Sequence, residues 1–209
     1  QAKKLSKQLI MNESLKTSNE NIYYNIDAIY TAVAENLQIS FRYFDQTLHK
    51  GRQYRNEGNK YQVSPYSLVL SNNNYYLIAF YEKYSGLSQF RVDRMDKVEV
   101  INEARIRPEV EKNLKSYTHN LFSMFSGKTC CVEILFDKDL INAALDKFGS
   151  DCIIIDVDEQ HFTVNTDVSI SPAFFAWLFK FGNKAKLISP PDVIADIKKH
   201  AEDFLACYQ

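Results

Sequence analysis

Glycine and proline are scarce in this 209-residue chain, which contains six glycines and five prolines. Their scarcity excludes collagen-like and low-complexity proteins, which depend on these two residues. No apolar run approaches the ~20 residues that a membrane-spanning helix needs. The N-terminal lysines Lys3, Lys4 and Lys7 have no apolar stretch behind them. The sequence therefore predicts neither a membrane segment nor a signal peptide.

Cysteine is also rare, with only Cys130, Cys131, Cys152 and Cys207. The first two are adjacent and point to opposite faces of any strand, so they make a poor disulfide framework. No Cys-x-x-Cys pair occurs, and no histidine lies at zinc-ligand spacing from a cysteine. We therefore expect buried, reduced cysteines in a cytoplasmic protein, with no metal site and no cofactor.

Arginine is missing from residues 110–209, because all seven arginines lie between Arg42 and Arg107. Residues 1–109 have 15 basic and 12 acidic side chains, whereas residues 110–209 have 10 and 14. Eleven of thirteen tyrosines lie at or before Tyr84, and ten of fourteen phenylalanines follow residue 120. The net charge of −1 excludes a uniformly basic nucleic-acid binder. The uneven distribution predicts two regions with different surface chemistry.

The first region has the pattern of one helix followed by short strands. Residues 1–22 are polar and predict the tail of a missing upstream domain. Apolar residues at helical spacing predict a helix over 26–37, with Asn25 as its N-cap. Alternation of apolar and polar residues then predicts five strands, at 39–43, 61–70, 75–81, 87–93 and 97–101. We expect a turn at 71–74, and a long loop or ragged strand ends at 49–60. Pro65 requires an edge or a bend in its strand. This order favours a small closed barrel of the SH3/Sm type over residues 23–108.

The second region alternates strands with helices. Residues 109–127 predict a connecting helix that ends at Gly127. Beyond it we expect strands at 129–136, 152–157, 161–170 and 185–188, and helices at 137–148, from Pro172 to Gly182, and after Pro190-Pro191. This βαββαβ order with a trailing helix predicts a ferredoxin-like unit over residues 128–209, so the fold class is α+β.

The strongest functional pattern lies in the predicted barrel. Tyr75 and Tyr76 occupy one strand, and Phe90, Arg91 and Arg94 occupy or follow the next. Aromatic rings stack on bases and arginine forks bind phosphates, so such neighbours suit a nucleotide-type ligand. The basic rim extends to Arg42, Arg52, Arg55 and Lys60. By parity Arg94 shares the face of Phe90, and points to the core unless the strand has ended.

Other interpretations of these residues stay open. Alternating Tyr and Phe also build barrel cores, and strand arginines usually face water, so the patch can be purely structural. Ser126-Gly127-Lys128-Thr129 ends like a phosphate-binding loop, but Phe122 stands where that loop needs glycine. No nucleophile, base and orienting group assemble in the sequence, so we expect no enzymatic activity.

Four sequence blocks resemble the WYL domain family. They are Ile39–Phe44, Val63–Leu68, Tyr75–Ala79 and Phe90–Arg94, and Tyr75 stands in place of the tryptophan for which the family is named. Residues after about 128 resemble the extension that often follows this domain, so the resemblance covers roughly residues 22–209.

The resemblance implies the sensor part of a bacterial transcriptional regulator. Such a regulator has an upstream winged helix-turn-helix that binds operator DNA, and residues 1–20 are too short to contain it. The implied ligand is a nucleotide or single-stranded nucleic acid, and the implied assembly is a homodimer. Mapping the motifs gives Tyr76, Arg91 and Arg94 as the main ligand-binding residues, with Tyr43, Ser64 and Arg52 as further candidates. The alternative is an oligomerisation module without a ligand.

Overall fold

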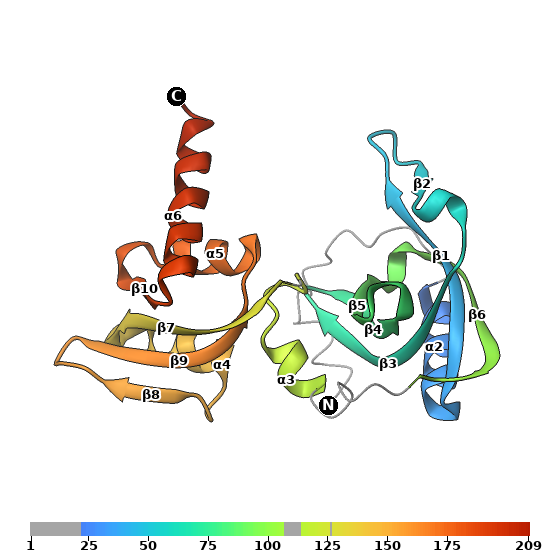
Figure 1. Ribbon diagram of the computed structural model, residues 1–209, viewed down its shortest axis with the longest axis horizontal. Helices are drawn as coiled ribbons and strands as arrows, with labels where there is room; N and C mark the ends of the chain where they lie inside the picture. The colour runs from blue at the N-terminus through green and yellow to red at the C-terminus, as the bar shows by residue number, and fades with distance from the viewer. Residues whose placement is uncertain (1–21, 107–113, 126) are drawn as a thin grey trace, which may run out of the picture. The chain divides into compact units, whose positions relative to one another are not determined.

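The computed structural model describes residues 22–106, 114–125 and 127–209. The chain divides into two compact units, Gln1–Glu109 and Val110–Gln209, here called the first and the second unit. Each unit is a mixture of α and β: a curled antiparallel sheet with a helix, and a second antiparallel sheet with several helices (Figure 1). The predicted boundary at Pro108 and nearly all of the predicted tail 1–22 lie outside the described residues.

Over its described residues, the first unit has one α-helix and six strands. They are α2 (Ile22–Glu35), β1 (Leu37–Gln46), β2 (Arg52–Tyr54), β3 (Tyr61–Ser71), β4 (Asn74–Tyr81), β5 (Gly86–Arg91) and β6 (Met95–Ala104). The sheet order is β2-β1-β3-β4-β5, and β6 pairs with β1. The five predicted strands are confirmed, and β2 forms within the segment for which a loop or ragged strand ends were predicted. Among the described residues no pairing joins β5 to β6. The six strands therefore form a curled sheet that this pair does not close.

Aromatic residues fill the inside of this sheet because strand residues alternate between its faces. Ile39, Phe41 and Tyr43 of β1 belong to one buried cluster. The Phe41 ring stacks on Tyr61 with centroids 5.6 Å apart, and Phe90 meets Phe41 edge-on at 5.1 Å. The predicted bend at Pro65 is confirmed, since the β3–β4 register shifts between Pro65 and Ser67.

Helix α2 differs from its prediction at both ends. It starts at Ile22 and ends at Glu35, because Asn36 takes a left-handed φ of 58° and the strand begins at Leu37. The assignment of Asn25 as N-cap was wrong, since Asn25 is buried inside the helix. Its Nδ2 donates hydrogen bonds to the carbonyl oxygens of Met95 at 3.0 Å and Val92 at 3.4 Å. A buried amide that satisfies two carbonyls belongs in the core rather than at a helix end.

The second unit follows the predicted order of strands and helices, but the helix predicted over 109–127 was wrong at its end. It ends at His119 rather than at Gly127, since Ser123 and Met124 take left-handed φ values of 49° and 60°. The unit contains α3 (Leu114–His119), β7 (Thr129–Asp137), α4 (Ile141–Phe148), β8 (Ile153–Asp156), β9 (His161–Ser169), α5 (Pro172–Phe179), β10 (Ala185–Ser189) and α6 (Pro191–Ala206). The antiparallel sheet has the order β10-β7-β9-β8. Gly149, with φ of 79°, follows α4 as predicted. The Ser171 hydroxyl caps α5 by accepting from the Phe174 amide at 3.3 Å.

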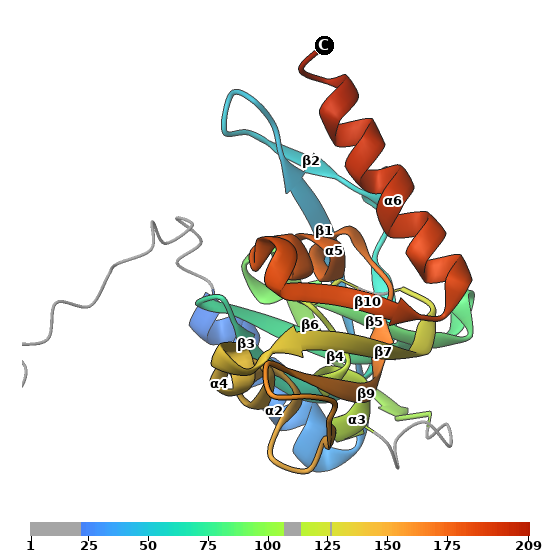
Figure 2. The ribbon, with the colours of Figure 1, turned by 90° about the vertical axis from the view of Figure 1, so that its left-hand side faces the viewer.

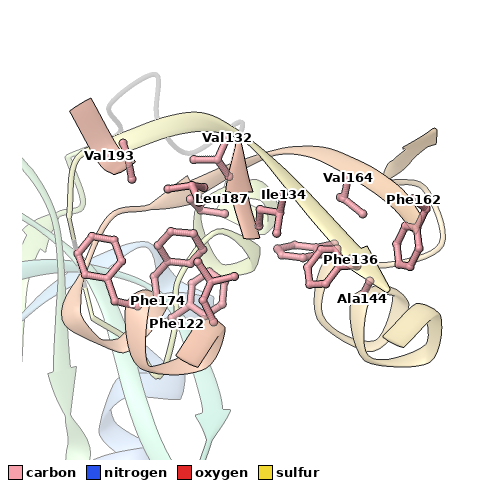
Figure 3. Packing of buried hydrophobic residues seen from close by; sticks show 14 residues of the cluster. Phe122, Val132, Ile134, Phe136, Ala144, Phe162, Val164, Phe174, Leu187 and Val193 are labelled. Carbon is pink, nitrogen blue, oxygen red and sulfur yellow. The ribbon is translucent and has the colours of Figure 1, made fainter. Parts of the chain in front are cut away.

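Phenylalanines dominate the core of the second unit. Figure 3 shows Phe136 of the sheet pointing toward Ala144 of α4, and both are fully buried. Trp177, the only tryptophan, packs against Phe181, Phe148 and Phe122 at centroid distances of 5.0, 5.3 and 5.4 Å. Helix α6 projects from the end of β10 as one straight helix (Figure 2).

All four cysteines are free, and their predicted burial was only partly right. Cys130 and Cys152 are half-buried, whereas Cys131 and Cys207 are exposed. Cys131 is exposed because β7 buries the alternate residues Val132, Ile134 and Phe136.

Candidate functional site

Two arginines of the first unit converge on one carboxylate. Arg55 grips Asp45 with two hydrogen bonds, from Nε to Oδ2 at 2.6 Å and from Nη2 to Oδ1 at 2.9 Å. Arg94 approaches the same Oδ1 through Nη1 at 3.4 Å. All three side chains are partly exposed, so solvent and a dissolved ligand can reach them. With Tyr43 these residues form what we call the Asp45 cluster.

Tyr43 is the buried wall of the Asp45 cluster. The Arg55 guanidinium carbon lies 5.4 Å from the centroid of the Tyr43 ring, and the Arg55 amide donates to the Tyr43 carbonyl at 2.8 Å. Burial raises the pKa of the Tyr43 hydroxyl, and the Arg55 hydrogen bonds lower the pKa of Asp45. Asp45 is therefore a carboxylate and Tyr43 a neutral phenol at neutral pH. The cluster presents two guanidinium groups beside an aromatic ring, which is the chemistry that binds phosphates and bases.

Arg91 belongs to a neighbouring cluster with Asn74, Tyr76 and Asp93, here called the Arg91 cluster. Its Nε and Nη2 donate to the two carboxylate oxygens of Asp93 at 3.0 and 2.7 Å, and Nη2 also donates to Asn74 Oδ1 at 2.7 Å. The Asp93 side chain is only 4% exposed. The hydrogen bonds from Arg91 to the Asp93 carboxylate raise the pKa of the Arg91 guanidinium. Tyr76 lies directly opposite Arg91 in the β4–β5 register.

The Asp45 and Arg91 clusters meet at Tyr43. Its hydroxyl oxygen accepts a hydrogen bond from the backbone amide of Arg91 at 3.0 Å. Arg94 lies in the 3₁₀ turn Val92–Arg94 that follows β5, so the strand has ended and Arg94 does not point into the core. The structure thus brings Tyr43, Tyr76, Arg91 and Arg94 together in one region.

Arg52 lies apart from these residues. Its guanidinium carbon is 4.5 Å from the centroid of the Phe44 ring, and its Nη1 is 3.6 Å from Asp96 Oδ1. Phe44 follows Tyr43 in β1, and successive strand residues point to opposite faces. Arg52 therefore flanks the other face of β1.

Ser64 is also separate. It is buried, and its hydroxyl accepts a hydrogen bond from the Ile106 amide at 3.0 Å. It lines a cleft of about 430 Å³ together with Lys60, Lys83, Glu82 and Glu103. Among the arginines that the structure describes, none lines this cleft. Because its lysines and glutamates balance in charge, it is a poorer match for a polyanion than the Asp45 cluster.

Residues 24–100 match the family model of the WYL domain. The chain contains a WYL domain. The match includes Tyr43, Asp45, Arg55, Arg91 and Arg94, so both clusters lie inside the WYL domain. Tyr75, in the position of the family's tryptophan, is 38% exposed on β4.

Two solved structures are similar to this chain over all or most of its length. One is proteasome accessory factor B/C (PafBC) of Arthrobacter aurescens, at 16% identity and a TM-score of 0.38, covering 100% of this chain and 30% of that one. The other is a CRISPR Cas-related protein, at 16% identity and a TM-score of 0.51, covering 90% of this chain and 52% of that one. The chain thus spans about half or less of the length of these proteins. The second similarity shows a shared fold. A comparison with curated proteins gave no match.

Sequence reasoning missed the acidic partners of the arginines in the WYL domain. Asp45 follows Tyr43 by two residues within β1, so strand parity was a usable signal for Asp45. Asp93 lies in the 3₁₀ turn after β5, where strand parity does not apply. Over the described parts of the chain, no three His, Cys, Asp or Glu side chains gather as a metal site would require. No helix in those parts is long and apolar enough to cross a membrane.

Proposed function

We propose that this chain is the ligand-sensing region of a bacterial, cytoplasmic transcriptional regulator, without enzymatic activity. Its first unit, which we assign to the SH3/Sm barrel type, binds a nucleotide or a single-stranded nucleic acid. The ligand then changes how an upstream winged helix-turn-helix binds operator DNA. The second unit we assign to the ferredoxin-like type, which the strand order β10-β7-β9-β8 supports. The WYL match supports the regulatory role.

The observation that carries the ligand proposal is the position of Asp45 between Arg55 and Arg94. A carboxylate held by two guanidinium groups marks a place where an anion is stable. Both ion pairs are partly exposed, and exposed pairs contribute only about 0–1 kcal/mol. A phosphate group with more negative charge can therefore displace Asp45 from Arg94 at a small cost.

The test is a titration of the 209-residue chain with a fluorescent six-nucleotide oligothymidylate and with nucleoside mono- and diphosphates, at two salt concentrations. Arg94→Gln should weaken binding about tenfold or more, as expected for a charge-assisted hydrogen bond of roughly 1.5–3 kcal/mol. It should also flatten the salt dependence by about 0.7 in log–log slope, for one fewer phosphate contact to a single strand. Arg52→Gln is the matched control and should change affinity less than twofold.

Asp45→Asn should change the affinity for these ligands in the opposite direction. Removing the internal carboxylate frees both arginines and removes its repulsion of the ligand, so affinity should rise about fivefold to tenfold, corresponding to roughly 1 kcal/mol. Equal affinities of wild type, Arg94→Gln and Asp45→Asn would show that the site is elsewhere. A chain that binds none of these ligands at low salt would favour the alternative, an oligomerisation module without a ligand.

A further inference from the structure

Strand β8 is a free edge of the second sheet (Figure 1). One side pairs with β9, from Ile153 opposite Asn165 to Asp156 opposite Phe162, and no described strand pairs with its other side. Four apolar side chains in the strand and directly after it are 63, 37, 49 and 53% exposed: Ile153, Ile154, Ile155 and Val157. Unpaired backbone groups beside exposed apolar side chains are a template for an added strand.

The hydrogen-bond register shows which backbone groups of β8 face outward. The Val157 amide donates to the His161 carbonyl of β9 at 3.1 Å. Opposite residues in an antiparallel pair alternate between bonded and non-bonded pairs, so Ile155 also bonds to β9. The amides and carbonyls of Ile154 and Asp156 therefore point away from β9, in the alternating pattern that an added strand requires.

A groove beside this edge offers a place for a side chain of an added strand. Ile154 and Phe162 line it together with Ile141 of α4, and its volume is about 260 Å³. Lys138 and Asp156 also line the groove and pair with each other at 2.8 Å. An extended segment can thus obtain main-chain hydrogen bonds from the edge and side-chain specificity from the groove.

The charges around β8 indicate the chemistry of the partner. Four exposed acids lie in the strand or beside it: Asp151, Asp156, Asp158 and Glu159. Lys138 pairs with Asp156, and His161 Nδ1 lies 2.9 Å from Asp158 Oδ1. The edge therefore keeps a net negative charge even when His161 is protonated. A second copy of this chain would bring the same acids to the edge, whereas lysine or arginine side chains would be attracted to it.

We propose that the β8 edge binds an extended segment of another protein, in which alternating apolar residues are flanked by lysine or arginine. The segment adds a strand through the amides and carbonyls of Ile154 and Asp156, and one of its apolar side chains enters the groove. Its basic residues lie toward Asp151 at one end of β8 and toward Glu159 at the other. Because exposed ion pairs are weak and screened by salt, the binding is reversible and weakens as salt rises.

The test is a fluorescence-anisotropy titration of the 209-residue chain with a labelled nine-residue peptide. In this peptide, valine and threonine alternate between a pair of lysines at each end. It should bind at low salt, and its affinity should fall as salt rises. The same peptide with glutamate for every lysine, or with proline at two central positions, should bind at least about tenfold more weakly.

A charge-removing variant tests the acids on the protein side. Asp151→Asn combined with Glu159→Gln should weaken binding of the lysine peptide about fivefold. Asp158 stays intact, because its carboxylate accepts hydrogen bonds from two amides of the turn. Glu202→Gln combined with Asp203→Asn is the matched control: it makes the same change of charge at exposed positions of α6 and should change affinity less than twofold.

Residue-resolved amide hydrogen exchange locates the peptide without any substitution. Saturating lysine peptide should protect the outward amides of Ile154 and Asp156. It should leave the exchange of Ile155 and Val157 nearly unchanged, because these amides already bond to β9.

Three results would overturn the proposal: no binding of the lysine peptide at low salt, equal binding of the lysine and glutamate peptides, or protection of other amides in place of Ile154 and Asp156. Protection of these two amides in the free chain as its concentration rises would overturn it as well, by making a second copy the occupant. This site belongs to the second unit, and none of its readouts uses a nucleotide. Its failure is therefore distinguishable from failure of the ligand proposal for the first unit.

Discussion

The two units differ in how their exposed side chains are partnered. In the first unit, Arg55 and Arg94 share Asp45, and Arg91 holds Asp93 with both guanidinium edges. In the second unit, the core is a set of packed aromatic rings, and three isoleucines of β8 face solvent. The exposed arginines of the first unit are thus already paired with internal carboxylates, whereas these isoleucines of the second unit leave apolar surface in contact with water. Charge pairing therefore dominates the one surface and apolar exposure the other.

The largest expected effect is a core truncation in the second unit. Phe174→Ala removes a fully buried ring that contacts Phe122 at a centroid distance of 5.0 Å. It should lower the free energy of unfolding by about 3–5 kcal/mol. Trp177 fluorescence during urea unfolding measures this, because the only tryptophan lies in this core. The control Phe204→Ala, at a ring that is 60% exposed, should cost little. Similar losses in both variants would contradict the core described for this unit.

A polar substitution should have nearly as large an effect in the first unit. Arg91→Ala leaves the buried Asp93 carboxylate without its guanidinium, which should destabilise the first unit by about 3 kcal/mol. The urea transition followed by far-UV circular dichroism should shift, while the Trp177 transition should keep its midpoint. Arg52→Ala, at an exposed pair, should cost under about 1 kcal/mol. If Arg91→Ala is as mild as Arg52→Ala, the Arg91 cluster does not stabilise the fold.

The smallest expected effect concerns Lys147, a half-buried cation of the second unit that can be compared with the carboxylate-paired arginines of the first. Lys147 donates from Nζ to the Leu121 carbonyl at 2.9 Å and lies 3.8 Å from the centroid of the Phe122 ring. Burial lowers the pKa of Lys147 from 10.5 to about 8. Between these two pH values the unfolded chain binds more protons than the folded one, so the free energy of unfolding rises with pH through this window. Below pH 8 Lys147 is protonated in both states, so it causes no change of stability with pH there.

Lys147→Met should remove this rise. Between pH 7.5 and 10, the stability of wild type should increase relative to Lys147→Met by about 1–2 kcal/mol, a value reduced for the partial exposure of the amine. Urea unfolding of both proteins at several pH values measures the difference, and subtracting the two curves cancels the other titrating groups. A difference that does not change with pH would mean that Lys147 keeps an ordinary pKa.

Local patterns predicted most of the fold but few of the contacts in the site. Alternation located the strands, Pro65 marked the bend, and Gly149 marked the end of α4, because each depends on neighbouring residues. Arg94 and Asp45 are 49 residues apart, so their contact depends on how β1 meets the turn after β5. Asn25 illustrates the same limit: its sequence position suited an N-cap, and only the tertiary fold places its amide beside Val92 and Met95.

The Asn25 contacts also give the arginine turn a mechanical connection. The two carbonyls that Asn25 holds flank Asp93 and Arg94 in the chain, so α2 and the turn that carries Arg94 share hydrogen bonds. A displacement of the backbone of this turn would stretch these hydrogen bonds or move α2 with it. Helix α2 is therefore mechanically connected to the turn that carries Arg94.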